Sequence, residues 1–331
     1  MINVRELTGE DTEEIASFLS TQTDSPTDAL RHRLNWLLRN PALSPDIPFG
    51  IGAFRDTCLR GVMICVPHRF REGNITKTCV LSILFYADRD ARGAGLRVFL
   101  KFRALASRYP LYVATANAVA SRIWLGLGGT PVAGSDCEYV HICRILPIGQ
   151  EALARAMRQS PSHPPAQVVD NPSLYSDNDH LRPLATPDEA VAIGAACAPE
   201  AGQYEIVRDV DFLRWKVYEA GEKAYAYRFG DSRCRCVFQH SRRGYRQQIA
   251  CTEIEDLCGN LAACDVSDFL RSVRQAFSPD MIMFRGCSRF AGMEGLKQKF
   301  KKRGFASPTA WLMDPNRLLD GRFGYSPLAG E

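Results

Sequence analysis

The chain has 331 residues, of which 46% are hydrophobic and 24% charged, with a formal net charge of +4. This length allows two domains with sizeable cores, and the composition is that of an ordinary globular protein. The small net charge gives no case for nucleic acid as the main partner, and neither a leader-like N-terminus nor an apolar run of membrane-spanning length is visible. We therefore expect a cytoplasmic protein without nucleic-acid or membrane partners.

Twelve cysteines are scattered along the chain, mostly within apolar runs. No Cys-x2-Cys is present, and the pair Cys234 and Cys236 has only His240 nearby, so the spacing does not favour a metal site. Reduced, buried thiols are the simpler interpretation. We predict no bound metal.

The most informative stretch runs from residue 79 to residue 105. Residues 79–87 form an apolar run typical of a buried strand, and residues 98–105 are typical of a helix. Residues 90–97, DARGAGLR, connect them through two glycines. A strand, a glycine-containing turn and a helix can bind phosphate, because backbone N–H groups and the helix dipole point at the anion. The P-loop motif and the full dinucleotide fingerprint are both missing, which argues against those nucleotide-binding classes.

A second pattern follows directly. Residues 111–115 predict a short strand, and residues 117–129, NAVASRIWLGLGG, predict a helix ending at glycine. The loop and this helix resemble the GNAT superfamily of acyltransferases, whose patterns are Gln/Arg-x-x-Gly-x-Gly/Ala and Asn-x2-Ala-x3-Tyr-x3-Gly-Phe. Arg97 replaces a small residue of the first pattern, and Trp124 and Gly129 replace Tyr and Phe of the second. The helix matches at Asn117, Ala120 and Gly128.

The resemblance implies an acyl-CoA site in this half of the chain. It places Phe85, Tyr86 and Ala87 along the pantetheine arm, with one backbone N–H of their strand facing the thioester oxygen. Arg97 could crowd the phosphates or supply them with an extra cation. The pyrophosphate and the rest of the coenzyme would contact the loop and the later helix, through Arg92, Gly93, Ala94, Gly95, Leu96, Arg97, Asn117, Arg122 and Trp124.

Beyond a segment rich in Pro, Ser and Asx at residues 160–179, the chain resembles its own first half. Three echoes keep the same order, with offsets of 177, 179 and 176 residues. They favour a tandem duplication. The echoes pair residues 4–11 with 181–188, 34–36 with 213–215, and 124–129 with 300–305.

We therefore predict an α/β fold of the α+β type, with two tandem GNAT-like domains. Each would contain a central, mostly antiparallel, twisted sheet flanked by helices. Residues 1–147 would bind acyl-CoA, residues 148–180 would form a helix and linker, and residues 181–331 would form a degenerate copy. The copy is degenerate because residues 258–265, which follow the strand equivalent to 79–87, contain one glycine and no arginine.

The sequence offers few groups for proton transfer. The GNAT family often carries a glutamate as base on the strand before the loop and a tyrosine as acid on the later helix. Here the strand interior has only Ser82. Trp124 occupies the catalytic position of the helix, although its indole N–H is not a useful acid. The candidate bases are Asp88, at the strand end, and Glu255, which shares a strand face with Glu253 and could face an inter-domain cleft.

We predict transfer of an acetyl or other acyl group from acyl-CoA to an amine of a small molecule, by direct attack at the domain interface. One alternative is a catalytically inactive GNAT-like binding module, which Arg97, Trp124 and the missing strand glutamate favour. Another is an acyltransferase whose donor is an acyl carrier protein or an aminoacyl-tRNA. The loop and the low net charge argue against an RNA-borne donor. The acceptor and the oligomeric state are left open.

Overall fold

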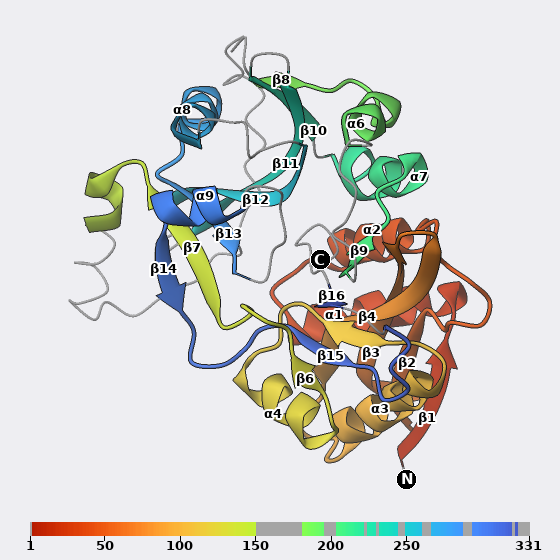
Figure 1. Ribbon diagram of the computed structural model, residues 1–331. Coiled ribbons are helices and arrows are strands. Elements are labelled where there is room, and N and C mark those ends of the chain that lie inside the picture. The colour runs from red at the N-terminus through yellow and green to blue at the C-terminus, as the bar shows by residue number, and fades with distance from the viewer. Residues whose placement is uncertain are drawn as a thin grey trace.

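The computed structural model describes residues 2–149, 181–194, 203–221, 224–229, 232–243, 249–259, 266–286, 293–319 and 322–323. These residues form two mixed sheets with helices on their faces, so the predicted fold class is confirmed (Figure 1). The first sheet has the order β1 (Ile2–Leu7), β2 (Gly50–Arg55), β3 (Cys58–Glu72), β4 (Ile75–Ala87), β5 (Leu111–Val113), β15 (Trp311–Met313), β6 (Thr130–Pro131). The second has the order β8 (Leu181–Pro183), β10 (Ala224–Phe229), β11 (Ser232–Arg243), β12 (Ile249–Gly259), β13 (Met281–Arg285), β7 (Cys137–Ile142), β14 (Lys301–Gly304).

The two halves exchange one strand each. β15, from the second half, lies between β5 and β6, and β7, from the first half, lies between β13 and β14. Along both main paths neighbouring strands are antiparallel except the pairs β4–β5 and β12–β13. Two further strands, β9 (Gln203–Ile206) and β16 (Arg322–Phe323), extend the first sheet from β3. Each sheet therefore contains strands from both of the sequence ranges 1–147 and 181–331. The predicted domain limits at these residues stay a prediction.

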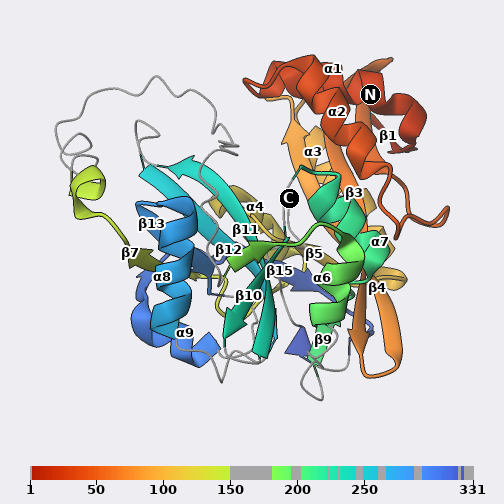
Figure 2. The ribbon, with the colours of Figure 1, turned by 90° about the horizontal axis from the view of Figure 1, so that it is seen from above.

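Helices cover both faces of each sheet (Figures 1 and 2). A central core joins residues of the two halves, including Leu34 and Val237, and two outer cores contain Phe99 and Phe269 respectively. We call the face toward the central core the inner face of each sheet. The inner helices are α1 (Thr12–Gln22), α2 (Thr27–Leu37), α6 (Pro187–Gly194) and α7 (Val210–Leu213). The outer helices are α3 (Ala94–Arg103), α4 (Ala118–Gly126), α8 (Val266–Phe277) and α9 (Met293–Lys299).

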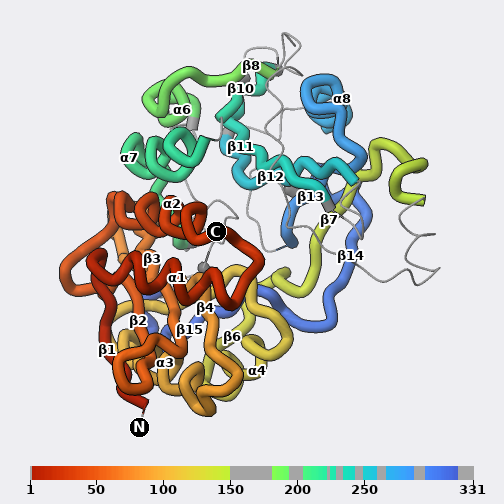
Figure 3. Tube along the Cα trace, turned by 180° about the vertical axis from the view of Figure 1, so that it is seen from behind, coloured from red at the N-terminus to blue at the C-terminus, as the bar shows by residue number. Residues whose placement is uncertain are grey.

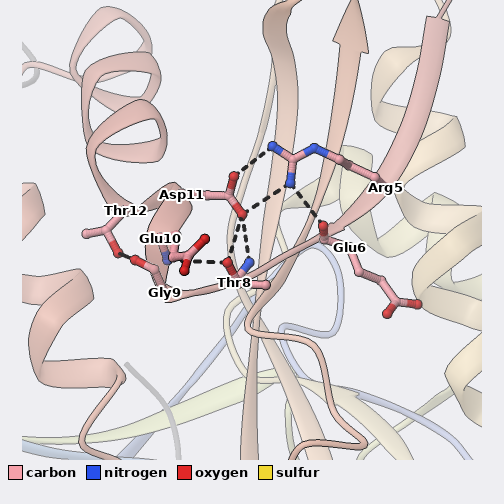
Figure 4. A network of polar contacts seen from close by, with 7 residues as sticks. All are labelled: Arg5, Glu6, Thr8, Gly9, Glu10, Asp11 and Thr12. Carbon is pink, nitrogen blue, oxygen red and sulfur yellow. Dashed lines mark hydrogen bonds and ion pairs between the residues drawn. The ribbon is translucent and has the colours of Figure 1, made fainter.

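The first echo in the sequence corresponds to a similar helix start in each half. Thr8 accepts a hydrogen bond from the Glu10 N–H at 3.3 Å, while Asp11 accepts one from the Thr8 N–H at 2.7 Å and pairs with Arg5 (Figure 4). In the second half, the Thr186 hydroxyl accepts from the Glu189 N–H at 3.3 Å and the Glu189 carboxylate accepts from the Ala185 N–H at 3.0 Å. Both arrangements provide acceptors for backbone N–H groups at a helix start.

The second echo is a contact between the halves. Trp36, on α2, and Trp215, on the π-helical turn Arg214–Tyr218, stack with their ring centroids 4.8 Å apart. Each indole N–H donates to the other residue's carbonyl oxygen, at 2.9 and 2.8 Å. Such reciprocity is typical of a two-fold interface. Figure 3 shows α2 beside α7. The third echo is not structural, because Trp124 is helical whereas residues 301–304 form β14.

Candidate functional site

The strands β4 and β5 separate inside the first sheet. Their parallel ladder contains two pairs among the described residues, and the last joins Leu81 to Tyr112. Beyond Leu81, β4 is bulged against β3, and Leu84 at the bulge has a φ of +49°. A positive φ is unusual for leucine and redirects the chain. The end of β4 is therefore free to offer backbone groups to a ligand in the gap between the strands.

A cavity of about 310 Å³ fills this gap. Phe99 and Trp124 line it from the outer helices α3 and α4, and Arg33 lines it from the inner helix α2. The cavity is thus lined from both faces of the sheet. Its described lining consists of Arg33, Met63, Ser82, Ile83, Leu84, Phe85, Tyr86, Phe99, Val113, Thr115, Ala116, Asn117, Ala120 and Trp124.

The predicted phosphate loop leads from β4 into α3. Gly93 has a φ of +82° directly before the helix, a conformation that favours glycine. Gly95 has a different role: a Cβ there would lie 3.1 Å from the Ala87 Cβ, so its absence lets α3 start close to β4. Arg92 and Gly93 are exposed. Because the first N–H groups of a helix have no intrahelical acceptor, this helix start can bind an anion.

The other residues expected to contact the coenzyme have identifiable local roles. The Arg97 guanidinium donates to the Ile2 carbonyl oxygen at 3.2 Å, so it holds β1. Asn117 caps α4, where its side chain accepts from the Val119 and Ala120 N–H groups at 3.0 and 2.9 Å. Arg122 is exposed and bonds to its own helix. Asn117 and Trp124 line the cavity, whereas Arg97 and Arg122 do not.

The predicted catalytic residues are not brought together. Asp88 accepts hydrogen bonds from the Asp90 N–H and the Arg60 guanidinium, both at 2.9 Å, which hold the pKa of its carboxyl below its usual range. This carboxylate closes the turn and does not line the cavity. Trp124 is a buried wall residue packed edge-on against Phe99. Glu255 is buried on β12 in the second sheet. Their catalytic roles stay predictions.

Arg33 is the site residue that sequence reasoning missed. It lies in the middle of a helix, outside the motifs, and only the packing of α2 brings it to the cavity. Tyr86 also belongs to the described lining of the cavity, and its place along the pantetheine arm stays a prediction. No local pattern in the sequence could have identified Arg33, because the other described residues that line the cavity are 30 to 91 positions further along the chain.

The second sheet contains an equivalent divergence. The β12–β13 ladder ends at Glu253 and Met283, and β12 is then bulged against β11. Asp256, beyond the end of this ladder, forms ion pairs with Arg235 and Arg208, both at 2.9 Å. The side chains of Arg235 and Asp256 are each 1% exposed. Residues 260–265 lie outside the described residues, so the predicted loss of the phosphate loop in this half stays a prediction.

The described stretches contain no group of three or more His, Cys, Asp or Glu side chains arranged to hold a metal ion. Cys234 and Cys236 are buried in β11, and the His240 ring hydrogen-bonds to the Thr252 hydroxyl. Burial raises the pKa of the Cys65 thiol far above its ordinary range, which makes it unreactive. No helix within the described ranges has the length and apolarity needed to cross a membrane.

Comparison with solved structures identifies the fold. A probable N-acyltransferase from Enterococcus faecalis has a TM-score of 0.55 at 10% identity, over 94% of this chain and 72% of that chain. A GCN5-related N-acetyltransferase from Anabaena variabilis has a TM-score of 0.55 at 10% identity, over 96% and 74%. Saccharomyces cerevisiae N-myristoyltransferase with bound myristoyl-CoA has a TM-score of 0.52 at 10% identity, over 95% and 82%.

No protein-family model and no curated protein matches the sequence significantly. The fold is therefore established by structure as two tandem GNAT-like units. The loop and helix patterns predicted the GNAT-like fold, and the echoes between the halves predicted the tandem arrangement.

Proposed function

We propose that this protein transfers a short acyl group from acyl-CoA to an amine of a small molecule, with acetyl as the leading candidate for the acyl group. The observation that carries the proposal is the cavity between β4 and β5, which is lined from both faces of the first sheet. A donor bound on the outer face and an acceptor bound on the inner face would meet in this gap. Direct attack requires such a meeting, because the two reacting atoms must lie within about 3.5 Å.

The residues on the outer side fit the donor. The free edge of β4, residues 82–87, would hydrogen-bond the pantetheine arm through backbone groups, and Phe85 and Phe99 would pack against it. The helix start at residues 92–96 would hold the pyrophosphate, with the exposed Arg92 as a nearby cation. One structural relative binds myristoyl-CoA, which carries a long acyl chain. We propose a short acyl group for this protein because the cavity has a volume of only about 310 Å³.

In the reaction, the amine nitrogen forms a bond to the thioester carbonyl carbon, the carbon–sulfur bond breaks, and the thiolate takes up a proton. A backbone N–H of the bulged end of β4 would stabilise the oxyanion. Tyr86 is our candidate to donate the proton to sulfur, because it belongs to the described lining of the cavity and carries a phenol hydroxyl. No carboxylate belongs to the described lining, so we propose that the amine attacks in its neutral form and that the proton it loses after the attack leaves through water.

The test is calorimetric titration of acetyl-CoA with a cavity-filling variant. Ala120 lines the cavity, and Ala118 lies exposed on the same helix, so Ala120→Phe and Ala118→Phe are a matched pair. We expect one acetyl-CoA per chain for the wild type and for Ala118→Phe, and binding lost in Ala120→Phe. Thermal melts would show whether each variant is folded. Absence of binding to the folded wild type would overturn the proposal. Two binding sites per chain would show that the second half also binds acetyl-CoA.

A catalytically inactive binding module is the second candidate, and the absence of a carboxylate from the described lining favours it. The two candidates differ in turnover. Release of free thiol from acetyl-CoA in the presence of amines would support the enzyme, whereas binding without thiol release across a broad amine panel would support the module.

A further inference from the structure

One charged residue belongs to the described lining of the cavity, and it is Arg33. The other described lining residues are apolar or uncharged, so among the described residues Arg33 is the one charge at this end of the cavity. Arg33 is partly buried, which strengthens its interaction with an anion relative to an arginine in open water.

Arg33 has no ion pair or hydrogen bond within the described part of the chain. Its helical neighbours at three and four positions are not acidic: Ala29, Leu30, Trp36 and Leu37. Other arginines of this region are paired: Arg31 with Glu13 at 2.6 Å and Arg39 with Glu219 at 3.0 Å. An unpaired, partly buried cation that lines a cavity is available for a ligand.

The position of Arg33 separates it from the donor's phosphates. α2 packs on the inner face of the first sheet through Leu30, Leu34 and Leu37, which belong to the central core. The predicted phosphate site is at the start of α3, which packs on the outer face. Arg33 therefore lies on the side from which the acceptor would enter.

We infer that the acceptor is an amine that also carries a carboxylate, and that Arg33 binds this carboxylate. The inference rests on the proposed function and narrows its substrate class. A guanidinium presents paired N–H donors that match the two carboxylate oxygens. A single cation among the described lining residues neutralises one negative charge, which favours a monoanionic carboxylate over a phosphate dianion. Amino acids and related amino-carboxylates fit this description.

The experiment compares Arg33→Gln with the wild type on matched pairs of acceptors. The pairs are L-lysine with cadaverine, L-phenylalanine with phenethylamine, and glucosamine 6-phosphate with glucosamine. The readout is kcat/KM for each acceptor with acetyl-CoA, together with the Kd of acetyl-CoA. Arg33→Lys keeps the positive charge but lacks the paired N–H donors of the guanidinium, so it tests whether charge alone restores transfer to the amino acids. Arg103→Gln is the charge-matched control, because Arg103 is exposed at the far end of α3.

We expect Arg33→Gln to lower kcat/KM for the amino acids by about 10- to 100-fold, the usual effect of losing a charged hydrogen-bond partner. Transfer to the decarboxylated amines and the Kd of acetyl-CoA should not change, and Arg33→Lys should recover part of the loss. The melting temperature of Arg33→Gln should equal or exceed that of the wild type, because no native partner is removed.

Several results would overturn the inference while leaving the proposed function intact. These are wild-type transfer to the decarboxylated amines as good as that to the amino acids, no transfer to any amino acid, or equal losses for both members of a pair. Preference for glucosamine 6-phosphate, lost in Arg33→Gln, would replace the carboxylate with a phosphate. A weaker Kd of acetyl-CoA in Arg33→Gln would assign Arg33 to the donor. Failure of acetyl-CoA to bind the folded wild type would instead refute the proposed function.

Discussion

The two halves share one architecture and differ in what lies where their parallel strands separate. In the first half, the separation of β4 from β5 contains a cavity of about 310 Å³ whose described lining has Arg33 as its one charged residue. In the second half, the end of β12 carries Asp256, which is buried between Arg235 and Arg208. Equivalent positions in the two sheets thus hold a space for a ligand in one case and an ion-paired cluster in the other.

This difference shows how one fold can supply a binding unit and a supporting unit. Diverging parallel strands leave backbone groups without ladder partners, and buried polar groups must find other partners. In the first half, a ligand can supply these partners. In the second half, charged side chains of the protein lie at the divergence, and the second unit contributes its inner face and Trp215 to the central core.

The largest expected effect tests the ion-paired cluster. Asp256→Asn would leave Arg235 and Arg208 without their shared carboxylate, at a position where Asp256 is 1% exposed. Breaking a buried ion pair on one side costs about 3–5 kcal/mol of the free energy of unfolding. Urea unfolding measures this loss. Binding of acetyl-CoA should remain at one per folded chain, because the cavity of the first half is untouched.

The control is Glu13→Gln, which breaks the exposed ion pair with Arg31 and should leave the free energy of unfolding nearly unchanged. A stable Asp256→Asn protein, or one that gains a second acetyl-CoA site, would contradict the view that the cluster is structural.

The next effect concerns the central core, where the halves meet. His68 on β3 lies 6.1 Å from the ring of Trp215, and its Nδ1 is hydrogen-bonded to the Tyr112 hydroxyl. Burial, followed by the charge of Lys216, lowers the pKa of His68 from 6.5 to about 3. The unfolded chain therefore binds a proton below pH 6.5 that the folded chain does not. Stability is lost as the pH falls, by about 1.4 kcal/mol for each pH unit in this window.

The measurement is urea unfolding of the wild type and His68→Gln between pH 5 and pH 8. The wild type should show the steeper loss below about pH 6, and His68→Gln should lose that part of the slope. His32→Gln is the control, because His32 is exposed on α2. Equal slopes in the wild type and His68→Gln would mean that His68 has the same pKa in the folded and the unfolded chain.

The sequence predicted those parts of the molecule that depend on local pattern. Residues 90–97 lead into a helix, and residues 118–126 form another helix, as the local patterns predicted. The second helix lines the cavity, whereas none of residues 90–97 belongs to its described lining. The strand exchange could not be predicted, because β15 has three residues and pairs with β5, 200 positions earlier in the sequence. Arg33 and the Asp256 cluster were missed for the same reason: their contacts are long-range, and neither has a motif.

The smallest expected effect tests whether Arg92, in the loop before α3, contacts the phosphates of the donor. Arg92 is exposed beside the helix start, so a phosphate contact there would be screened by water and salt. Arg92→Gln should weaken acetyl-CoA binding by about 2- to 5-fold, and the difference should grow at low ionic strength. Arg103→Gln, at the other end of α3, should bind like the wild type at every salt concentration.

Equal salt dependence in Arg92→Gln and Arg103→Gln would remove Arg92 from the donor site but would keep the backbone N–H groups of α3 in it. If binding also tolerated Ala120→Phe, the site would have to lie outside the first half. The distinction between a ligand-binding half and a supporting half would then fail, since it depends on the donor entering between α3 and α4. A salt-dependent loss confined to Arg92→Gln would place the donor's phosphates at the start of α3, on the face opposite Arg33.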